Sequence, residues 1–192
     1  MKIRFIGDTH GSFTKYQKLI GDAQNTIQVG DFGIGFGMEQ HLHKVDPTKH
    51  RFVRGNHDDP VKAKEFPHFI QDGFYDGMFF VGGAKSVDQK HRTEWVDWWK
   101  NEEVSYGESM ELLSQYEQIL PAVVVTHDCP TIALNGIREQ SMTAQLFDAM
   151  FEIHVPKFWI FGHHPNDGVK TIKGCEFVCV YNKVFDLDLS EV

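Results

Sequence analysis

The sequence predicts an α/β protein in which two sheets pack together, with helices on the outside. Short apolar runs of β-branched and aromatic residues alternate with amphipathic stretches, as strands and helices do in layered architectures. Residues 184–189 then alternate between apolar and polar, which indicates a half-exposed antiparallel strand. A chain of 192 residues, 41% of them hydrophobic, can bury a sizeable core, so we expect a single domain over residues 1–192.

Five apolar runs predict buried strands, and each run ends in Gly, Asp, Asn or His. These runs are residues 2–6, 26–29, 52–53, 122–125 and 158–161. Residues 69–83 are dense in glycine and aromatic residues, which predicts a hairpin and an edge strand. Residues 176–189 predict a strand, a turn near Asn182 and Lys183, and the final antiparallel strand.

Amphipathic stretches predict helices at residues 12–24, 108–119 and 139–151. Ser12 is a suitable N-cap for the first of them. The side chains that we expect to face the core are Met110, Leu113 and Ile119 from the second helix, and Met142, Leu146, Ala149 and Met150 from the third. Trp95, Trp98 and Trp99 also lie at helical spacing, which favours packing, with stacking on a nucleobase as the alternative.

Composition narrows the functional classes. The formal net charge is −8 and the Lys and Arg residues are scattered, so we expect no extended nucleic-acid footprint. A small phosphorylated substrate remains compatible with this charge, because bound cations can reverse the local field.

No run approaches the ~20 apolar residues of a membrane span, and the apolar stretch at residues 1–6 is too short for a signal peptide. Cys129, Cys175 and Cys179 lack paired zinc spacings and predict small buried side chains, so we expect a reducing, cytoplasmic setting. The sequence does not indicate an oligomeric state.

Polar side chains with metal-ligating atoms follow the five predicted strands. They are Asp8, His10, Asp31, Asn56, His127 and His163. Because the carboxyl ends of the strands meet at one edge of an open α/β sheet, we expect these side chains to converge there. Asp31 has two carboxylate oxygens and could bridge two ions. The mixture of nitrogen and oxygen ligands suits Mn, Fe or Zn better than Mg or Ca.

The ordered motifs resemble those of the calcineurin-like metallophosphoesterase family. They are Asp8-Thr9-His10, Gly30-Asp31, Gly55-Asn56-His57-Asp58, Thr126-His127 and Gly162-His163, and they span most of the chain. The stretch at residues 82–88, followed by Arg92 and Trp98-Trp99, is similar to small bacterial and phage members of the family. The resemblance implies a four-layer αββα sandwich that holds two divalent metal ions.

The resemblance also implies roles for individual residues. Asp8, His10 and Asp31 would hold the first metal, and Asp31, Asn56, His127 and His163 the second. A metal-bridging hydroxide would attack phosphorus in line, because bound metal lowers the pKa of water. His57 takes the position of the histidine that stabilises or protonates the leaving oxygen. The implied activity is a phosphatase or phosphodiesterase acting on small phosphoesters, nucleotides among them, with Mn as the preferred metal and Fe, Zn or Mg as alternatives.

Two departures from the family pattern bear on activity. Serine/threonine phosphatases follow Gly-Asp with two residues and then Asp-Arg, whereas this chain has Ile34 and Gly35 at those places, which disfavours a protein phosphatase. Many phosphodiesterase members have Gly-His-x-His, whereas Pro165 stands at the second histidine of this chain. We therefore expect fewer protein ligands for the first metal, and a substrate-facing or structural role for His164.

Two predicted catalytic residues have alternative roles. Arg92 could replace the missing phosphate clamp, since arginine pairs bidentately with phosphate, or it could lie in a solvated basic turn. Asp58 could orient His57 or cap the next helix. A second functional class is a non-catalytic interaction scaffold, like the retromer scaffold subunit, which resembles a phosphoesterase with a degraded site. The presence of His57 and of the full ligand set favours the enzyme.

Overall fold

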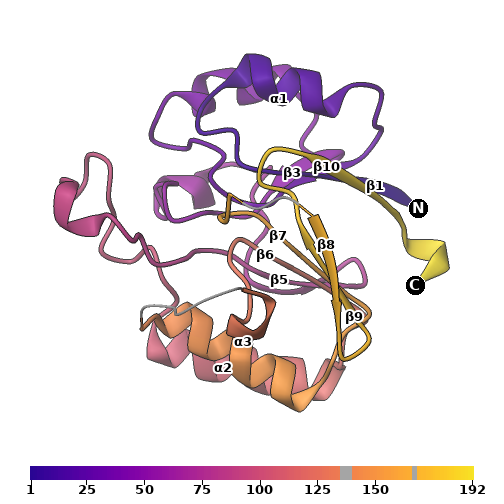
Figure 1. Cartoon of the computed structure of the whole chain (residues 1–192). Helices are drawn as coiled ribbons and strands as arrows, with labels where there is room; N and C mark the ends of the chain where they lie inside the picture. The colour runs from indigo at the N-terminus through magenta and orange to yellow at the C-terminus, as the bar shows by residue number, and fades with distance from the viewer. Residues whose placement is uncertain (135–139, 166–167) are drawn as a thin grey trace.

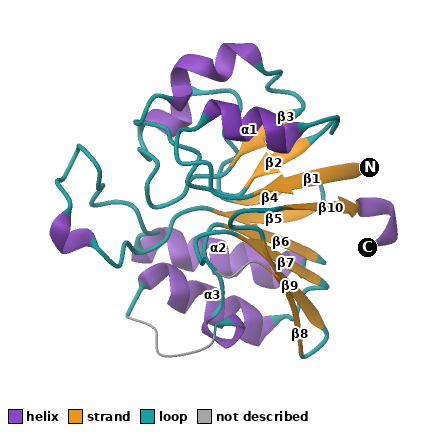
Figure 2. Ribbon diagram, turned by 45° about the horizontal axis from the view of Figure 1, so that its top comes forward, coloured by secondary structure: helices purple, strands orange, loops and turns teal. Residues whose placement is uncertain are grey.

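Two sheets lie face to face between layers of helices, as Figures 1 and 2 show for the computed structural model. The structure describes residues 1–134, 140–165 and 168–192. The first sheet has the strand order β10-β1-β2-β3, and the second has the order β4-β5-β6-β7-β9-β8. The strands of the first sheet are β1 (Lys2–Ile6), β2 (Thr26–Gln28), β3 (His50–Phe52) and β10 (Val184–Asp188). Those of the second are β4 (Gly73–Tyr75), β5 (Met78–Val81), β6 (Val123–Thr126), β7 (Phe158–Phe161), β8 (Gly168–Ile172) and β9 (Cys175–Cys179).

Helix α1 covers the outer face of the first sheet, and α2 and α3 cover the outer face of the second (Figure 1). The α-helices are α1 (Phe13–Ile20), α2 (Tyr106–Ile119) and α3 (Met142–Ile153). Short 3-10 helices are η1 (Met38–Lys44), η2 (Lys62–Glu65), η3 (Gln89–His91), η4 (Thr131–Ala133) and η5 (Leu189–Glu191). This arrangement confirms the predicted four-layer αββα sandwich. None of the helices in the described ranges is long and apolar enough to cross a bilayer.

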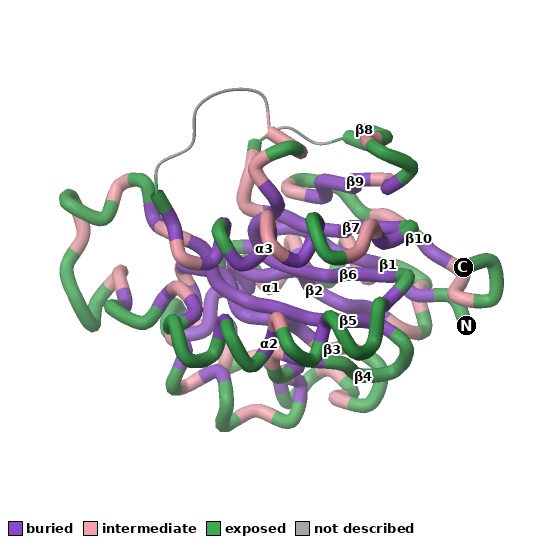
Figure 3. The backbone as a smooth tube through the Cα atoms, turned by 90° about the horizontal axis from the view of Figure 1, so that it is seen from below, coloured by how far each residue is buried: buried purple, intermediate pink, exposed green. Residues whose placement is uncertain are grey.

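The period of two along each strand sorts side chains between the layers. On β7, Phe158 and Ile160 join the core between the sheets, while Trp159 and Phe161 pack against the helices. Figure 3 shows that the central strands are buried along most of their length. The sheets therefore form a rigid support, and the polar residues at the strand ends stand at the edge of this support.

The buried face of α2 differs from the prediction. The helix begins two residues earlier than expected, at a capping box made by Ser105 and Glu108. Met110 and Ile119 are 50% and 37% exposed, so their predicted core positions are wrong. The helix turns Tyr116 to the sheet instead, where its ring meets Phe79 edge to face at 5.3 Å. Leu112, one turn before Tyr116, is buried on the same face, so the helix buries this stripe in place of Met110 and Ile119.

The predicted N-cap of α1 and two predicted core positions of α3 are confirmed. Ser12 caps α1 as expected, with its side chain accepting a hydrogen bond from the Lys15 N–H. Leu146 and Met150 of α3 are buried as predicted, whereas the predicted start of that helix at residue 139 lies outside the described residues. The tryptophans do not share a helix: Trp99 is buried, but Trp95 is 65% exposed on an irregular segment after η3.

Candidate metal centre

The predicted ligands follow strands of both sheets, so the expectation that a single sheet edge carries them is wrong. Those that follow β1, β2 and β3 come from the first sheet, and those that follow β6 and β7 come from the second. The sheets stack with the carboxyl ends of these strands at the same end of the molecule. This stacking brings ligands from two sheets into one cluster, which a single sheet edge would spread over several strand spacings.

The cluster consists of two triads that share one carboxylate. Ligand atoms of Asp8, His10 and Asp31 lie within 4.8 Å of one another, and so do those of Asp31, His127 and His163. The two oxygens of Asp31 face different triads. Its Oδ1 lies 3.3 Å from Nε2 of His127, and its Oδ2 lies 3.9 Å from Nδ1 of His10. Asn56 joins the second triad, with its Oδ1 3.0 Å from Nε2 of His127.

Three residues of the cluster have unusual backbone conformations. His10, Asp31 and His163 have φ values of 47°, 54° and 59°, in the left-handed region that non-glycine residues rarely adopt. Such residues cost about 1–3 kcal/mol each and persist where the surrounding structure enforces them, often at functional sites. Here the carbonyl of Asp31 accepts hydrogen bonds from the N–H groups of Thr9 and His10, at 3.1 and 2.8 Å. These bonds tie the ends of β1 and β2 together.

Two motif glycines allow carboxylates to approach the backbone. A Cβ on Gly55 would lie 2.1 Å from Oδ1 of Asp31, and a Cβ on Gly162 would lie 2.3 Å from Oδ1 of Asp8. Any larger residue at either position would displace a carboxylate of the cluster. The glycines that precede Asn56 and His163 in sequence therefore serve the ligands that come from β1 and β2.

The tautomer of His127 directs a lone pair into the second triad. Its Nδ1 lies 2.9 Å from the carbonyl oxygen of Val29, which only accepts, so Nδ1 carries the proton. Its Nε2 then faces the oxygens of Asp31 and Asn56. Burial alone would lower the pKa of His127, but the charge of Asp31 raises it to about 9. Three electron-pair donors facing one another need a cation between them, and in the metal-free protein a proton takes that place.

Asp8 also fits a cation. The side chain is buried, and among the described residues its Oδ2 has no hydrogen-bond partner. Burial raises the pKa of Asp8 to about 7, although the neighbouring His127 lowers it. For Asp31, burial is outweighed by the charge and hydrogen bond of His127, which hold its pKa well below the ordinary value. A buried carboxylate oxygen without a partner, beside an ionised carboxylate and imidazoles, matches the mixed ligand set of a transition-metal site.

His57 and Arg92 meet at the rim of the cluster. Nε2 of His57 lies 3.9 Å from Oδ2 of Asp31 and 3.4 Å from Nη2 of Arg92. The carboxylate of Asp88 holds the guanidinium through two hydrogen bonds of 2.7 and 2.8 Å. Burial and the charge of Arg92 lower the pKa of His57, against the opposing effect of Asp31. Of the two alternatives for Arg92, its position beside His57 favours the clamp over a solvated turn.

Asp58 is a structural residue of the centre rather than either of the alternatives that we predicted. Its carboxylate is buried and accepts hydrogen bonds from the N–H groups of Phe32, Gly33, Ile34 and Gly55. The turn that follows is capped by Asp59, whose Oδ1 accepts from the N–H groups of Val61 and Lys62. Asp58 therefore fastens the loop after β2 to the loop after β3, because a fully buried carboxylate needs several donors.

Three features of the site were not predicted. The amide of Asn56 donates to Oγ of Ser86, and Ser86 donates to the carboxylate of Glu102. Nε2 of His164 lies 2.7 Å from Oδ1 of Asp128, and Asp128, His163 and His164 could offer a further set of ligand atoms. The pair fits the structural alternative that we expected for His164, and the further set of ligand atoms fits a ligand role that we did not expect. The only sequence signal for Ser86 was its place in the stretch 82–88, because its partners lie 30 and 16 residues away.

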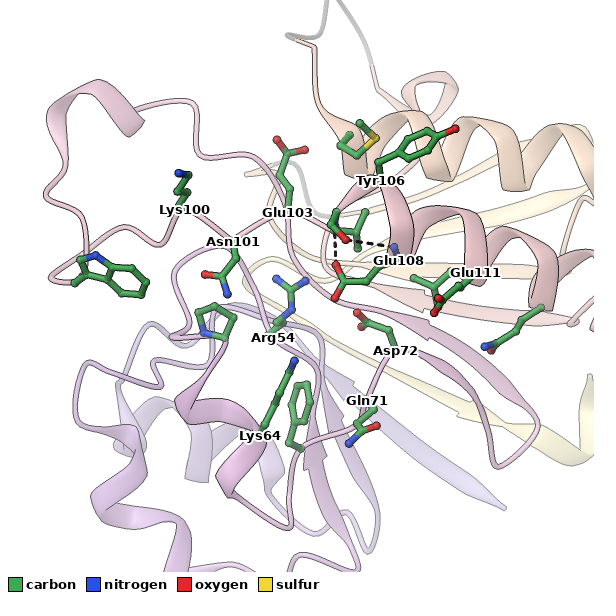
Figure 4. A pocket seen from close by; sticks show the side chains of 18 residues that line it. Arg54, Lys64, Gln71, Asp72, Lys100, Asn101, Glu103, Tyr106, Glu108 and Glu111 are labelled. Carbon is green, nitrogen blue, oxygen red and sulfur yellow. Dashed lines mark hydrogen bonds between the residues drawn. The ribbon is translucent and has the colours of Figure 1, made fainter.

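A separate groove of about 790 Å³ lies between the start of α2 and the segment before β4 (Figure 4). Its lining includes Arg54, Lys64 and Lys100 together with Asp72 and Glu111, so it presents charges of both signs. None of the predicted ligands is among its described lining residues. Arg54 is buried and donates to the carbonyl of Glu102.

Comparison with known proteins agrees with this geometry. A search of curated proteins gives no match. Among solved structures, the chain is similar to one titled "Putative 5'-Nucleotidase from Staphylococcus aureus in complex with alpha-ketoglutarate", with 14% sequence identity and a TM-score of 0.50. The alignment covers 93% of this chain and 48% of that one, so this chain spans about half the length of that protein, and the likeness shows the fold. The family model described as calcineurin-like phosphoesterase matches residues 1–167. This protein belongs to the calcineurin-like phosphoesterase family.

Proposed function

We propose that this protein hydrolyses small phosphate esters with the help of two divalent cations. The observation that carries the proposal is the pair of triads joined by Asp31, whose two oxygens face different groups of ligands. The first cation would be held by Asp8, His10 and Asp31, and the second by Asp31, Asn56, His127 and His163. Imidazole and carboxylate ligands together favour Mn, with Fe, Zn and Mg as alternatives.

The cations, when bound, would polarise the phosphoryl oxygens and acidify water enough for it to act as a nucleophile near neutral pH. Arg92, held in place by Asp88, would bind phosphate oxygens that point away from the ligand cluster. The phosphoryl group carries its charge on several oxygens during transfer, so a fixed guanidinium at the rim stabilises the transition state.

His57 would protonate the leaving oxygen. Its imidazole is mostly neutral near pH 7 in the free protein, because burial and Arg92 lower its pKa. A phosphate dianion bound beside it would raise that pKa, since a nearby negative charge favours the protonated ring. The ring then donates its proton as the ester bond breaks, and the attacking water supplies the proton that restores the balance.

The proposal favours small phosphoesters, including nucleotides, over phosphoproteins. Ile34 and Gly35 occupy the places of the Asp-Arg pair of protein phosphatases. Residues 32–37 of this loop contain no arginine that could bind a phosphorylated side chain. The N–H groups of Ile34 and Gly35 donate to Asp58 and Glu39, which fixes the backbone of the loop. The similarity to the Staphylococcus aureus protein supports the fold only, so a nucleotide is one candidate among small phosphoesters.

The test is metal-dependent hydrolysis. Metal-free protein, verified by elemental analysis, is assayed with an aryl phosphate monoester, an aryl phosphodiester, cyclic nucleotides and dinucleoside polyphosphates, before and after addition of Mn²⁺. We expect no turnover without metal, recovery with Mn²⁺, and two Mn²⁺ bound per chain by calorimetry. The Asp31→Asn variant should lose both properties, while Asp22→Asn, a change at a 96% exposed aspartate, should lose neither. Turnover by metal-free protein would refute the mechanism, and the absence of any turnover with two metals bound would favour a scaffold.

A further inference from the structure

A chain of three buried polar side chains leads away from the metal centre. Asn56, Ser86 and Glu102 are 1%, 3% and 4% exposed. Nδ2 of Asn56 lies 2.9 Å from Oγ of Ser86, and this Oγ lies 2.5 Å from Oε2 of Glu102. The N–H of Ser86 donates to Oε1 of the same carboxylate at 2.9 Å. The side chain of Ser86 therefore lies between an amide and a carboxylate.

The chemistry of these groups sets the direction of the chain. Burial raises the pKa of Glu102, whereas its hydrogen bonds with the hydroxyl and N–H of Ser86 oppose this rise. The ionised carboxylate only accepts hydrogen bonds, so the single hydroxyl proton of Ser86 points to Glu102. The Ser86 oxygen can then only accept from Asn56. The amide of Asn56 must direct its NH₂ group to Ser86 and its oxygen to His127, which is the orientation observed. With the opposite orientation, the NH₂ group would face the ligand cluster and repel a cation.

We propose that Ser86 and Glu102 are positioning residues that hold the oxygen of Asn56 toward the second metal site. The inference rests on the proposed function, because it assigns Asn56 as a ligand. Metal ligands commonly depend on hydrogen-bonded partners of this kind, which fix which atom faces the metal. Here the residue that determines the orientation is Glu102, which does not touch the ligand cluster itself.

The position of Glu102 is itself fixed. Nη1 of Arg54 donates to the carbonyl oxygen of Glu102 at 2.6 Å. Residues 86 and 102 are the two ends of the segment that carries Arg92, so the Ser86–Glu102 pair also closes the base of this segment. A test must therefore separate the orientation of the Asn56 amide from the placement of the segment.

Glu102→Gln provides this separation. The change keeps the volume but adds an NH₂ group that can donate to Ser86, which frees the Ser86 hydroxyl to donate to Asn56 and allows its amide to turn over. We expect affinity for the second Mn²⁺ to fall by roughly 10–100-fold, as for other partners of metal ligands, measured by calorimetry on metal-free protein. The visible absorption spectrum of the Co²⁺ form should change as well, because one oxygen ligand is lost or displaced.

The control is a second Ser–Glu pair, whose glutamate, Glu103, directly follows Glu102 in the sequence. Ser141, the N-cap of α3, donates to the carboxylate of Glu103 and is also buried. Glu103→Gln makes the same chemical change at a helix terminus without a link to Asn56. We expect it to lower the melting temperature without changing the affinity for the second Mn²⁺.

A double-mutant cycle distinguishes positioning from general support. In wild-type protein, Ser86→Ala should weaken the second Mn²⁺ site as Glu102→Gln does. In an Asn56→Asp background both terminal atoms are oxygens, so orientation no longer matters, and Ser86→Ala should change the affinity by no more than about twofold. A merely structural serine would weaken the site in both backgrounds. If Ser86→Ala does not fold, Glu102→Gln alone decides.

The possible results separate this inference from the proposed function. Wild-type binding of two Mn²⁺ with an unchanged second affinity in Glu102→Gln would overturn the positioning role and leave the metal-dependent hydrolase intact. Equal losses from Ser86→Ala in both backgrounds would also overturn it. Wild-type protein that binds no divalent metal would refute the proposed function, and the inference with it.

Discussion

Replacing Asp58 by asparagine tests how strongly the loops of the metal centre depend on one buried carboxylate. Oδ1 of Asp58 accepts from the N–H groups of Gly33 and Ile34 at 2.6 and 2.9 Å. Oδ2 accepts from those of Phe32 and Gly55 at 3.1 and 2.7 Å. Asparagine has the same shape but only one acceptor oxygen. Whichever way its amide turns, two N–H groups lose their acceptor and face an NH₂ group.

The expected destabilisation follows from these lost bonds. A hydrogen bond to a charged group contributes about 1.5–3 kcal/mol, so the loss of two predicts about 3–6 kcal/mol for Asp58→Asn. A domain of this kind has a free energy of unfolding of about 5–15 kcal/mol, so the change removes a large part of it. The loop also carries Asp31, so metal affinity should fall in parallel.

Urea unfolding of the metal-free protein, monitored by circular dichroism, measures the change in the free energy of unfolding. The matched control is Asp148→Asn. Asp148 accepts from the N–H and the hydroxyl of Thr131, and because the hydroxyl can reverse its role, an asparagine can satisfy both groups. We expect less than about 1.5 kcal/mol for the control. A change below about 1 kcal/mol for Asp58→Asn would show that the four amides do not depend on the carboxylate.

Further predictions concern catalysis and metal binding. His57→Ala should lower kcat by roughly 10²–10⁴-fold for a substrate with a poor leaving group while both metals remain bound, and a near-normal kcat would exclude the general acid. Arg92→Ala should raise the inhibition constant of free phosphate, whereas Arg51→Ala, at a surface ion pair with Asp76, should not. An inhibition constant of Arg92→Ala equal to that of the wild type would place Arg92 outside the substrate site. Because the pKa of His127 is raised to about 9 and that of Asp8 to about 7, the metal-free ring is protonated and Asp8 is partly protonated near pH 7, so Mn²⁺ binding there should release between one and two protons. Calorimetry in buffers of different ionisation enthalpy measures this release, which should decline as the pH rises through 9; no release near pH 7 would contradict the pKa. Finally, the first site, with the fewer protein ligands, should empty before the second during gentle chelation, and metal-specific anomalous scattering showing equal occupancy throughout would contradict this order.

The sequence alone predicted the layered fold and the strand ends that carry the ligands. Both are local properties, because an apolar run followed by Gly-Asp or Gly-His marks a buried strand and its end within a few residues. The Ser12 cap and the buried Leu146 and Met150 were predictable for the same reason. Where two faces of a helix were both plausible, as on α2, the sequence could not rank them, because the choice depended on Tyr116 finding Phe79 across the layer.

Only the tertiary structure decided how the site is supported. It showed that the predicted ligands come from two sheets, that Asp58 binds four backbone amides, and that Ser86 lies between the amide of Asn56 and the carboxylate of Glu102. These partners lie between 3 and 30 residues apart along the chain, with no common spacing. A hydrogen bond needs an approach within a few tenths of an ångström and a suitable direction, and the packing of distant segments sets both. Local motifs therefore predict which residues are candidate metal ligands, whereas the fold determines how the ligand atom of each residue is oriented.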